Sequence, residues 1–585
     1  MVRDRTAKRG PVVNGRKRWI ALVSVIGAAA LALGAADDGQ QEGGAKFEVV
    51  YYDGLDEDGN LVGGRVMMPV VEPPLVLAGS NFTTIIDNGP PSNRIDLVCV
   101  GDGYLESELA NYETHVDEAI VDLLSIEPFT TYSTYFNVHR VDVVSLESGV
   151  DHDPTYPIWR DTALGMGFWC GGTERLLCVN VGAAMAHAAN APDVDQIFAV
   201  ANSSKYGGAG YTSSDLATFA GANSVAAQIA IHELGHSLGD LADEYDYGGG
   251  VNWTGGEVPE PNVSIMDAAE MAADGGKWAA WLGENQFEFD GLVDCYEGAR
   301  YYQMGIFRPS NNSMMRALAR PFNLPSVEAL ITEMYQIVRP IDDSTPNTQT
   351  LEGDETVWVE PLRPVGHDLS IQWVMNGEPI EGANGETFDL ATLGLEPGTY
   401  SLRVRVKDET EWVRNEAARN QWMTQSIQWN VEVPPEDASL EAFVIRRGEL
   451  ISGGLAQLEQ SDNSRLKIQS EFTGGNPAYL MITEITLDSE VIDPNLLDIH
   501  VESKITQNGG TAKLYLKNWS TGAWVLVRTY PIGRTEQTKK ALNLSAASYI
   551  RDSGMIKLRI RHEMPVSLTG GEFDSHIDQV RALVR

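Results

Sequence analysis

The segment from Ile231 to Gly239 reads IHELGHSLG and places two histidines, His232 and His236, four positions apart. On a helix, residues at this spacing project from one face, so both imidazoles can bind one metal ion. Glu233 lies between them, where its carboxylate can accept a proton from a zinc-bound water. The pattern predicts one Zn²⁺ per chain, held by His232 and His236, with Glu233 as the catalytic base.

A third ligand must come from further along the chain, because a catalytic zinc takes three protein ligands and keeps one position open. On an unbroken helix, Asp240 would lie about 12 Å along the axis from His232, too far to share the ion. Gly239 offers a break, and the acidic residues Asp243 and Glu244 follow it. We expect Asp243 to be the third ligand, with Glu244 as the alternative. The other carboxylate would then orient an imidazole.

The fourteen residues from His232 to Tyr245, HELGHSLGDLADEY, resemble the signature of the IgA-peptidase family of bacterial zinc metallopeptidases, number sixty-four among the metallopeptidase families. The resemblance extends over residues 94–334, through GDGY at 101–104, FNVHRVD at 136–142, YGGAG at 206–210, YEG at 296–298 and FRP at 307–309. It implies a metzincin-like endopeptidase domain. One departure is Ala242, which stands where metzincins in general place the third ligand, so the choice between Asp243 and Glu244 stays open.

The resemblance also implies a methionine turn that forms an apolar floor beneath the metal. Met315, which follows the FRP motif, fits the family pattern, and Met266 in the sequence Ser-Ile-Met-Asp is the alternative. Most methionines only fill a hydrophobic core. We also expect His139 and His152 to be structural hydrogen-bonding partners, and Tyr206 to close the edge of a cleft within a glycine-rich turn.

The chain is long enough for several domains. Strand-like runs at 95–100, 138–145 and 196–201 alternate with a helical pattern at 106–124, which predicts an α/β catalytic domain over 91–340, preceded by a small β-rich segment over 37–90. Strand patterns and turns then predict an immunoglobulin-like β-sandwich at 346–434. A Pro-Pro linker leads to a jelly-roll-like β-sandwich at 440–585. The expected fold class is therefore multidomain, with a metzincin-like α/β peptidase domain followed by two β-sandwich domains.

The amino terminus carries basic residues followed by an apolar run from Trp19 to Ala36. This predicts a signal peptide over 1–36 and secretion to an extracellular or periplasmic location, although residues 19–36 could instead remain as a membrane anchor. In an oxidising compartment, Cys170 and Cys178 are close enough to form a disulfide. Cys99 and Cys295 would either pair or remain free thiols.

The formal net charge is −39, with 82 acidic and 43 basic residues, which argues against nucleic acid as a partner. We therefore expect a secreted zinc endopeptidase that hydrolyses peptide bonds of extracellular proteins, with a possible glycan or cell-surface ligand on the β domains. The alternatives are a surface-binding protein with an inactive metal domain, and metal-assisted hydrolysis of another bond. The intact Glu233, His232 and His236 favour an active enzyme.

Overall fold

The computed structural model describes residues 47–54, 61–69, 81–248, 250–474, 478–491, 494–568 and 571–585. The predicted signal peptide or anchor at 1–36 lies outside these residues. Among the residues that are described, no helix is long and apolar enough to cross a membrane.

An eight-stranded sheet forms the framework of the first half of the chain, in the order β2-β1-β7-β8-β6-β4-β5-β3. Its centre is parallel, with β4 paired to β5 and β6, and β6 paired to β8. Most residues of these strands are apolar, because both faces of the sheet are covered. Their bounds are β1 (Phe47–Tyr52), β2 (Gly64–Pro69), β3 (Phe82–Ile86), β4 (Ile95–Asp102), β5 (Phe136–Val141), β6 (Gln196–Ala201), β7 (Gly208–Tyr211) and β8 (Leu216–Ala220).

The predicted β-rich segment at 37–90 does not form a unit of its own over its described residues. Its strands β1 and β2 extend one edge of the sheet, and β3 extends the opposite edge. The difference has a simple cause, since local alternation of apolar residues indicates a strand but not its partner. The amino-terminal segment is therefore part of the α/β domain.

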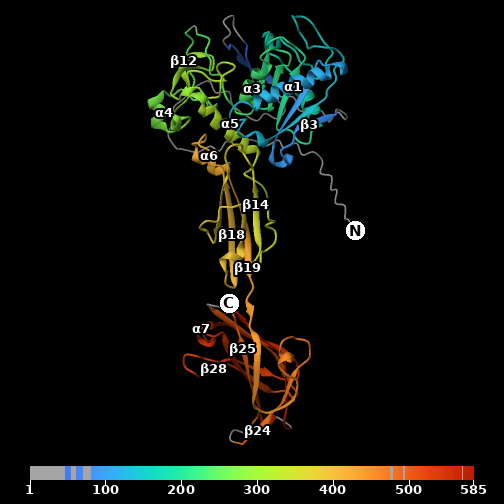
Figure 1. Cartoon of the computed structure of the whole chain (residues 1–585), viewed down its shortest axis with the longest axis vertical. Helices are drawn as coiled ribbons and strands as arrows, with labels where there is room; N and C mark the ends of the chain where they lie inside the picture. Colours follow the sequence, from blue (N-terminus) through green and yellow to red (C-terminus); the bar gives the residue numbers. More distant parts are fainter. Residues whose placement is uncertain are drawn as a thin grey trace, which may run out of the picture. The chain divides into compact units, whose positions relative to one another are not determined.

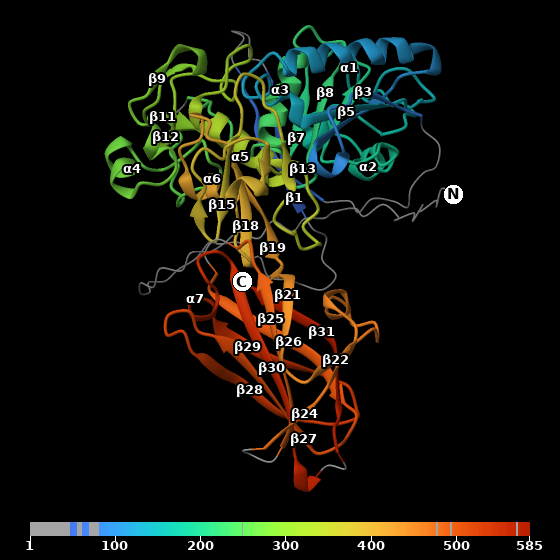
Figure 2. The ribbon, with the colours of Figure 1, turned by 60° about the horizontal axis from the view of Figure 1, so that its bottom comes forward.

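Helices cover the two faces of this sheet (Figure 2). The helices α1 (Leu109–Leu123) and α3 (Ala226–Ser237) share one hydrophobic core, whereas α2 (Val181–Ala188) packs into a separate core on the other face. The predicted helix at 106–124 corresponds to a short 3₁₀ turn followed by α1. Cys170 and Cys178 form the predicted disulfide, and Cys99 and Cys295 are free.

Short elements connect α3 to the end of the α/β domain. They are α4 (Ala268–Asp274), β9 (Asn285–Gln286), β10 (Gly291–Leu292), β11 (Tyr296–Ala299), β12 (Tyr302–Arg308) and α5 (Leu324–Ile337). The helix α5 begins where the Asn323 side chain accepts a hydrogen bond from the Ser326 backbone, which satisfies one of the free N–H groups of the first turn.

Two sheets follow over residues 341–433, drawn in yellow to orange in Figure 1. One contains β13 (Ile341–Ser344), β14 (Thr356–Pro361) and β17 (Thr387–Asp389), and the other contains β16 (Glu378–Pro379), β15 (Ser370–Met375), β18 (Gly398–Lys407) and β19 (Thr424–Val433). Buried Trp373 and Trp429 pack at the centre with ring centroids 5.6 Å apart. The helix α6 (Glu416–Gln421) lies between β18 and β19 in the sequence.

The last part of the chain forms two six-stranded sheets around one apolar core, as expected for a β-sandwich. The burial of β30 alternates residue by residue, which is the pattern of a strand with one face in the core. The first sheet contains β20 (Glu436–Asp437), β22 (Glu449–Ser452), β23 (Leu466–Gln469), β26 (Leu496–Ile505), β29 (Gln537–Ser545) and β31 (Asp574–Val584). The second contains β21 (Ser439–Arg447), β24 (Glu471–Thr473), β25 (Ala478–Asp488), β27 (Gly510–Lys517), β28 (Trp524–Ile532) and β30 (Met555–Pro565), and α7 spans Ala546–Tyr549.

Buried polar contacts join the α/β domain to the sandwich that follows it. The carboxylate of Asp408 is fully buried and accepts hydrogen bonds of 2.8 Å from the hydroxyls of Tyr132 and Tyr335. Its other oxygen lies 3.0 Å from Nε2 of His367. Asp342, in β13, forms a 2.6 Å ion pair with Arg94.

Replacement of Asp408 by Ala should destabilise the protein, because it removes the carboxylate that accepts from the buried hydroxyls of Tyr132 and Tyr335. We expect the free energy of unfolding to fall by on the order of 3 kcal/mol, measured by urea denaturation with tryptophan fluorescence. The exposed neighbour Glu409 is the matched control, and Glu409→Ala should change it by less than about 0.5 kcal/mol. Equal unfolding curves for the two variants would show that the Asp408 contacts do not stabilise the fold.

Candidate metal centre

The helix α3 lies unusually close to strand β7, and glycines on the strand make this possible. A Cβ atom added to Gly210 would lie 2.9 Å from both the Glu233 carbonyl oxygen and the His236 Cβ. A Cβ added to Gly208 would lie 3.0 Å from Glu233 Oε1. Any larger residue at these positions would push the helix away. The Gly-rich segment therefore determines how closely Glu233 and His236 approach the edge of the sheet.

The chain turns back directly after α3. Asp240 has a positive φ of 52°, and the Leu241 N–H donates to the Gly235 carbonyl over 3.1 Å. A Cβ added to Gly239 would lie 2.9 Å from the same carbonyl, so glycine is needed for this close turn. The break expected at Gly239 is therefore present, and it returns residues 241–244 toward the histidines.

Backbone carbonyls fix the orientation of both imidazoles. Nδ1 of His232 donates to the Met314 carbonyl over 2.9 Å, and Nδ1 of His236 donates to the Leu241 carbonyl over 2.6 Å. A carbonyl only accepts, so each Nδ1 must carry the proton, and each Nε2 is left available for a metal. The two Nε2 atoms lie 3.2 and 3.4 Å from Asp243 Oδ1.

The side chains of His232, His236 and Asp243 form a compact, buried group of possible ligands, with one atom from each within 4.8 Å of the others. Their surroundings favour a positive charge. Burial alone lowers the pKa of His232, but the hydrogen bond to Asp243 and the charges of Asp53 and Asp243 outweigh it and raise that pKa to about 9. Burial raises the pKa of Asp243, but the two histidines outweigh it, so the net pKa is lowered.

Glu244 points to a different set of partners. Its carboxylate accepts hydrogen bonds from Ser313 Oγ at 2.7 Å, Asn323 Nδ2 at 2.9 Å and Asn262 Nδ2 at 3.0 Å. Its backbone N–H donates to the Met315 carbonyl over 2.8 Å. Glu244 therefore ties the returning chain to the loop before α5, and it is not among the residues that surround the two Nε2 atoms.

Four buried carboxylate oxygens at this site, on Glu233 and Asp53, have no hydrogen-bonding partner. Burial raises the pKa of both carboxyl groups. The negative charges of Asp53 and Asp243 raise the pKa of Glu233 further. Unpaired buried carboxylates are costly unless a cation or protons compensate them. Together with two imidazoles that present Nε2, this donor set fits a divalent metal such as zinc.

Met315 packs against α3 at Gly235. A Cβ added to Gly235 would lie 2.6 Å from the Met315 sulfur, so the thioether packs against the helix between His232 and His236. Met266 is partly buried and immediately precedes the Asp267 cap of α4. Of the two candidate methionines, Met315 is thus the one that packs against α3 at Gly235.

The other candidates have distinct surroundings. His139 bonds Asp96 at 2.9 Å and Thr84 at 3.1 Å, and His152 packs against Tyr156 and Trp159. Neither is in the described group of possible ligands. Tyr206 lies close to the site. Burial raises the pKa of its hydroxyl, and the negative charges of Asp53 and Glu233 raise that pKa further.

Three residues that no sequence motif indicated also reach the centre. The ring of Tyr51 stacks on His236, with centroids 4.2 Å apart and an angle of 8° between the planes. Asp53 Oδ2 lies 3.8 Å from His232 Nε2. The Tyr301 hydroxyl donates to Asp243 Oδ2. Tyr51 and Asp53 are about 180 residues from the histidines in sequence, so local spacing contains no signal for them.

Several solved carbohydrate-binding modules show weak similarity to the chain. One is TmCBM61 in complex with β-1,4-galactotriose, at 7% identity, 25% coverage of this chain, 92% of that chain and a TM-score of 0.18. Another comes from a study of the promiscuous specificity of modules from the β-sandwich superfamily, at 14% identity, 41% and 96% coverage and a TM-score of 0.20. TM-scores at this level do not establish a common fold. No curated protein matches the sequence.

The family model described as IgA Peptidase M64 matches residues 83–289. This stretch contains His232, Glu233, His236, Asp243 and Glu244, and it ends before Met315. The match supports a peptidase. The predicted resemblance to the IgA-peptidase family is thereby confirmed over residues 83–289 of the chain.

Proposed function

We propose that the chain is a zinc endopeptidase of metzincin-like architecture, with His232, His236 and Asp243 as ligands and Glu233 as the base. The observation that carries this proposal is the convergence of two imidazole Nε2 atoms on Asp243 Oδ1, beside the unpaired carboxylate of Glu233. Met315 serves as the methionine floor. The signal-like sequence at 1–36 supports secretion, so the substrates would be extracellular proteins.

Each residue of the centre has a distinct task in peptide hydrolysis. A bound zinc would supply Lewis-acid chemistry that lowers the pKa of water and polarises the scissile carbonyl. Glu233 accepts the proton of the attacking water and delivers it to the leaving amine. Asp243 and the carbonyls that accept from each Nδ1 hold the ligand geometry. The Tyr301 hydroxyl restrains the second oxygen of Asp243.

The first test of the metal assignment compares the two adjacent carboxylates. Asp243→Ala should lower zinc affinity by at least about tenfold, because it removes a donor that faces both Nε2 atoms. Glu244→Ala should destabilise the loop but leave zinc affinity closer to that of the wild type. Zinc content after dialysis against a graded chelator, measured by mass spectrometry, reports both. If Glu244→Ala alone releases the metal, the assignment of Asp243 is wrong.

The second test separates metal binding from turnover. Glu233→Gln preserves the shape of the side chain but removes the proton acceptor, so the rate of peptide cleavage should fall by about two to four orders of magnitude. The zinc content should remain at one per chain, and His236→Ala should lose it. Cleavage of a fluorogenic peptide library and metal analysis provide the measurements. A Glu233→Gln protein that holds zinc and retains wild-type activity would contradict the mechanism.

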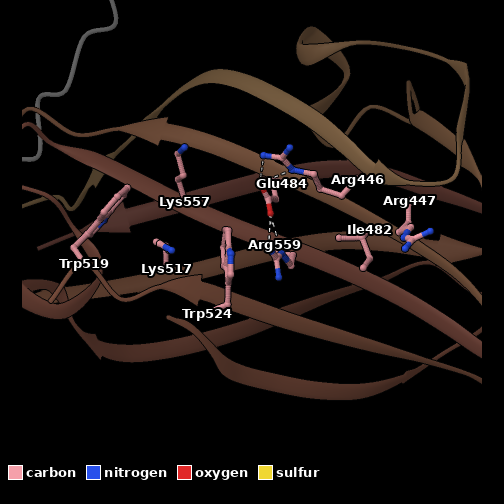
Figure 3. A pocket seen from close by; sticks show the side chains of 9 residues that line it. All are labelled: Arg446, Arg447, Ile482, Glu484, Lys517, Trp519, Trp524, Lys557 and Arg559. Carbon is pink, nitrogen blue, oxygen red and sulfur yellow. Dashed lines mark hydrogen bonds and ion pairs between the residues drawn. The ribbon is translucent and has the colours of Figure 1, made fainter. Parts of the chain in front are cut away.

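A second function is favoured by a cavity of about 450 Å³ on the last sandwich (Figure 3). Five cationic side chains line it, namely Arg446, Arg447, Lys517, Lys557 and Arg559, together with one acidic residue, Glu484. Such a cluster is unexpected in a chain of net charge −39. Glu484 accepts from both Arg446 and Arg559, at 2.9 and 3.0 Å, which holds these two guanidinium groups in place.

Two tryptophans complete the lining of this cavity. The Arg559 guanidinium lies 4.0 Å from the centroid of Trp524, and the Trp519 indole N–H donates to the Tyr549 carbonyl over 3.0 Å. An indole offers an apolar surface for a sugar ring, while Arg and Lys pair with carboxylate or sulfate groups. We therefore propose an acidic saccharide as the ligand of this cavity, which would direct the peptidase to glycan-rich surfaces.

Calorimetry with tetragalacturonate and neutral cellotetraose tests this ligand class. The acidic saccharide should bind with an affinity that weakens as salt is added, and the neutral one should not bind detectably. Trp524→Ala should lower the affinity about tenfold, as expected for the loss of one aromatic contact. Lys557→Ala should also weaken binding, and Lys540→Ala, on a strand of the other sheet, is its charge-matched control. Absence of tetragalacturonate binding, or equal affinity for both saccharides, would count against an acidic-saccharide site.

A further inference from the structure

The strand β1 covers the side of β7 that lies next to the proposed catalytic residues, and β2 forms the outer edge of the sheet. It pairs antiparallel with β7, with Val50 opposite Tyr211 and Tyr51 opposite Gly210. Gly210 is the residue against which Glu233 and His236 pack. An extended peptide that joins an exposed sheet edge gains main-chain hydrogen bonds. In this structure, a segment of the chain itself uses that edge.

The side chain of Tyr51 covers one metal-binding imidazole. Its ring is nearly parallel to that of His236, and only 3% of Tyr51 is exposed. The Tyr51 hydroxyl donates to Glu260 Oε1 over 2.9 Å, and the same oxygen accepts from Arg300 over 2.8 Å. These contacts anchor the Tyr51 side chain of β1 beside His236.

Asp53 follows β1 and reaches the opposite imidazole. Its carboxylate is 99% buried, has no hydrogen-bonding partner for either oxygen, and lies 3.8 Å from His232 Nε2. The neighbouring glycines permit this approach, because a Cβ on Gly54 would lie 1.9 Å from the Arg175 side chain and one on Gly63 would lie 2.3 Å from the Tyr245 hydroxyl. A buried carboxylate of this kind requires a cation or a proton to compensate it, and the Asp53 carboxylate lies beside His232, Glu233 and Tyr206.

We propose that Asp53 is a fourth protein ligand of the metal and that residues 47–53 hold the peptidase in a latent state. This inference rests on the proposed zinc-peptidase function. Four protein ligands complete a tetrahedral site, whereas catalysis requires that one position be open. Asp53 closes that position, and β1 simultaneously fills the edge of β7 that an extended substrate would use.

Because β1 is part of the same chain, it competes strongly with a substrate for the edge of β7. A segment tethered to the same chain competes with an effective concentration on the order of millimolar, well above that of most protein substrates. Catalysis therefore requires that β1 leave the edge of β7. The full burial of His232 and Glu233 agrees with a closed centre.

The test uses the full chain loaded with Co²⁺ in place of zinc, with acetohydroxamate as a small probe of the open position. In Asp53→Ala, Co²⁺ should still bind at one per chain, its visible spectrum should change, and acetohydroxamate affinity should increase at least about tenfold. Peptide cleavage should increase in parallel. Asp53→Asn retains the shape of the side chain but is a poorer ligand, so it should give the same changes. Arg65→Ala is the control, because Arg65 is exposed and lies opposite Tyr51 in the hairpin.

The possible results separate a failure of the latent state from a failure of the zinc-peptidase function on which it rests. If both Asp53 variants bind Co²⁺ with an unchanged spectrum and unchanged acetohydroxamate affinity, Asp53 is not a ligand, although the zinc site stands. If Asp53→Ala and Asp53→Asn lose Co²⁺ altogether, Asp53 is a permanent ligand and the latent state is refuted. If the wild type also binds no Co²⁺, the zinc-peptidase function itself fails.

Discussion

The centre of this protein depends on the compensation of buried negative charge. Asp53, Glu233 and Asp243 lie together with almost no exposure, and the first two have no hydrogen-bonding partner for either carboxylate oxygen. The penalty for such a cluster is severe without a cation. The two imidazoles present Nε2 because backbone carbonyls accept from Nδ1. The surrounding backbone therefore leaves both Nε2 atoms available to a metal, and in the proposed latent state that metal would also hold Asp53 in place.

Close packing of backbone elements makes this arrangement possible. Gly208 and Gly210 let α3 approach β7, and Gly235 lets Met315 lie against the opposite side of the helix. Glu244 then ties the returning chain to Ser313 and Asn323 through short hydrogen bonds. The helix is thus fixed on three sides, which is what precise metal geometry requires.

The following sandwich is coupled to this framework through buried contacts. Asp408 connects the hydroxyls of Tyr132 and Tyr335, and Arg94 pairs with Asp342 at the boundary. Contacts of this kind restrict independent motion of adjacent domains. The final sandwich has its own apolar core and a basic, tryptophan-containing cavity, which suits a binding module better than a part of the catalytic centre.

The sequence by itself determined the local features. The spacing of His232, Glu233 and His236 indicated the helix and its chemistry, the apolar runs located β4, β5 and β6, and the eight-residue separation of Cys170 and Cys178 indicated their disulfide. These features depend on residues within a few turns of each other, for which periodicity is informative.

Only the tertiary structure decided which carboxylate faces the imidazoles and which distant residues join them. Asp243 and Glu244 are adjacent, and a single turn at Asp240 directs them to different partners. Tyr51 and Asp53 arrive because β1 pairs with β7, and long-range pairing of edge strands leaves no periodic trace in the sequence. The physical reason is that strand pairing and chain reversal depend on contacts between residues far apart in the chain.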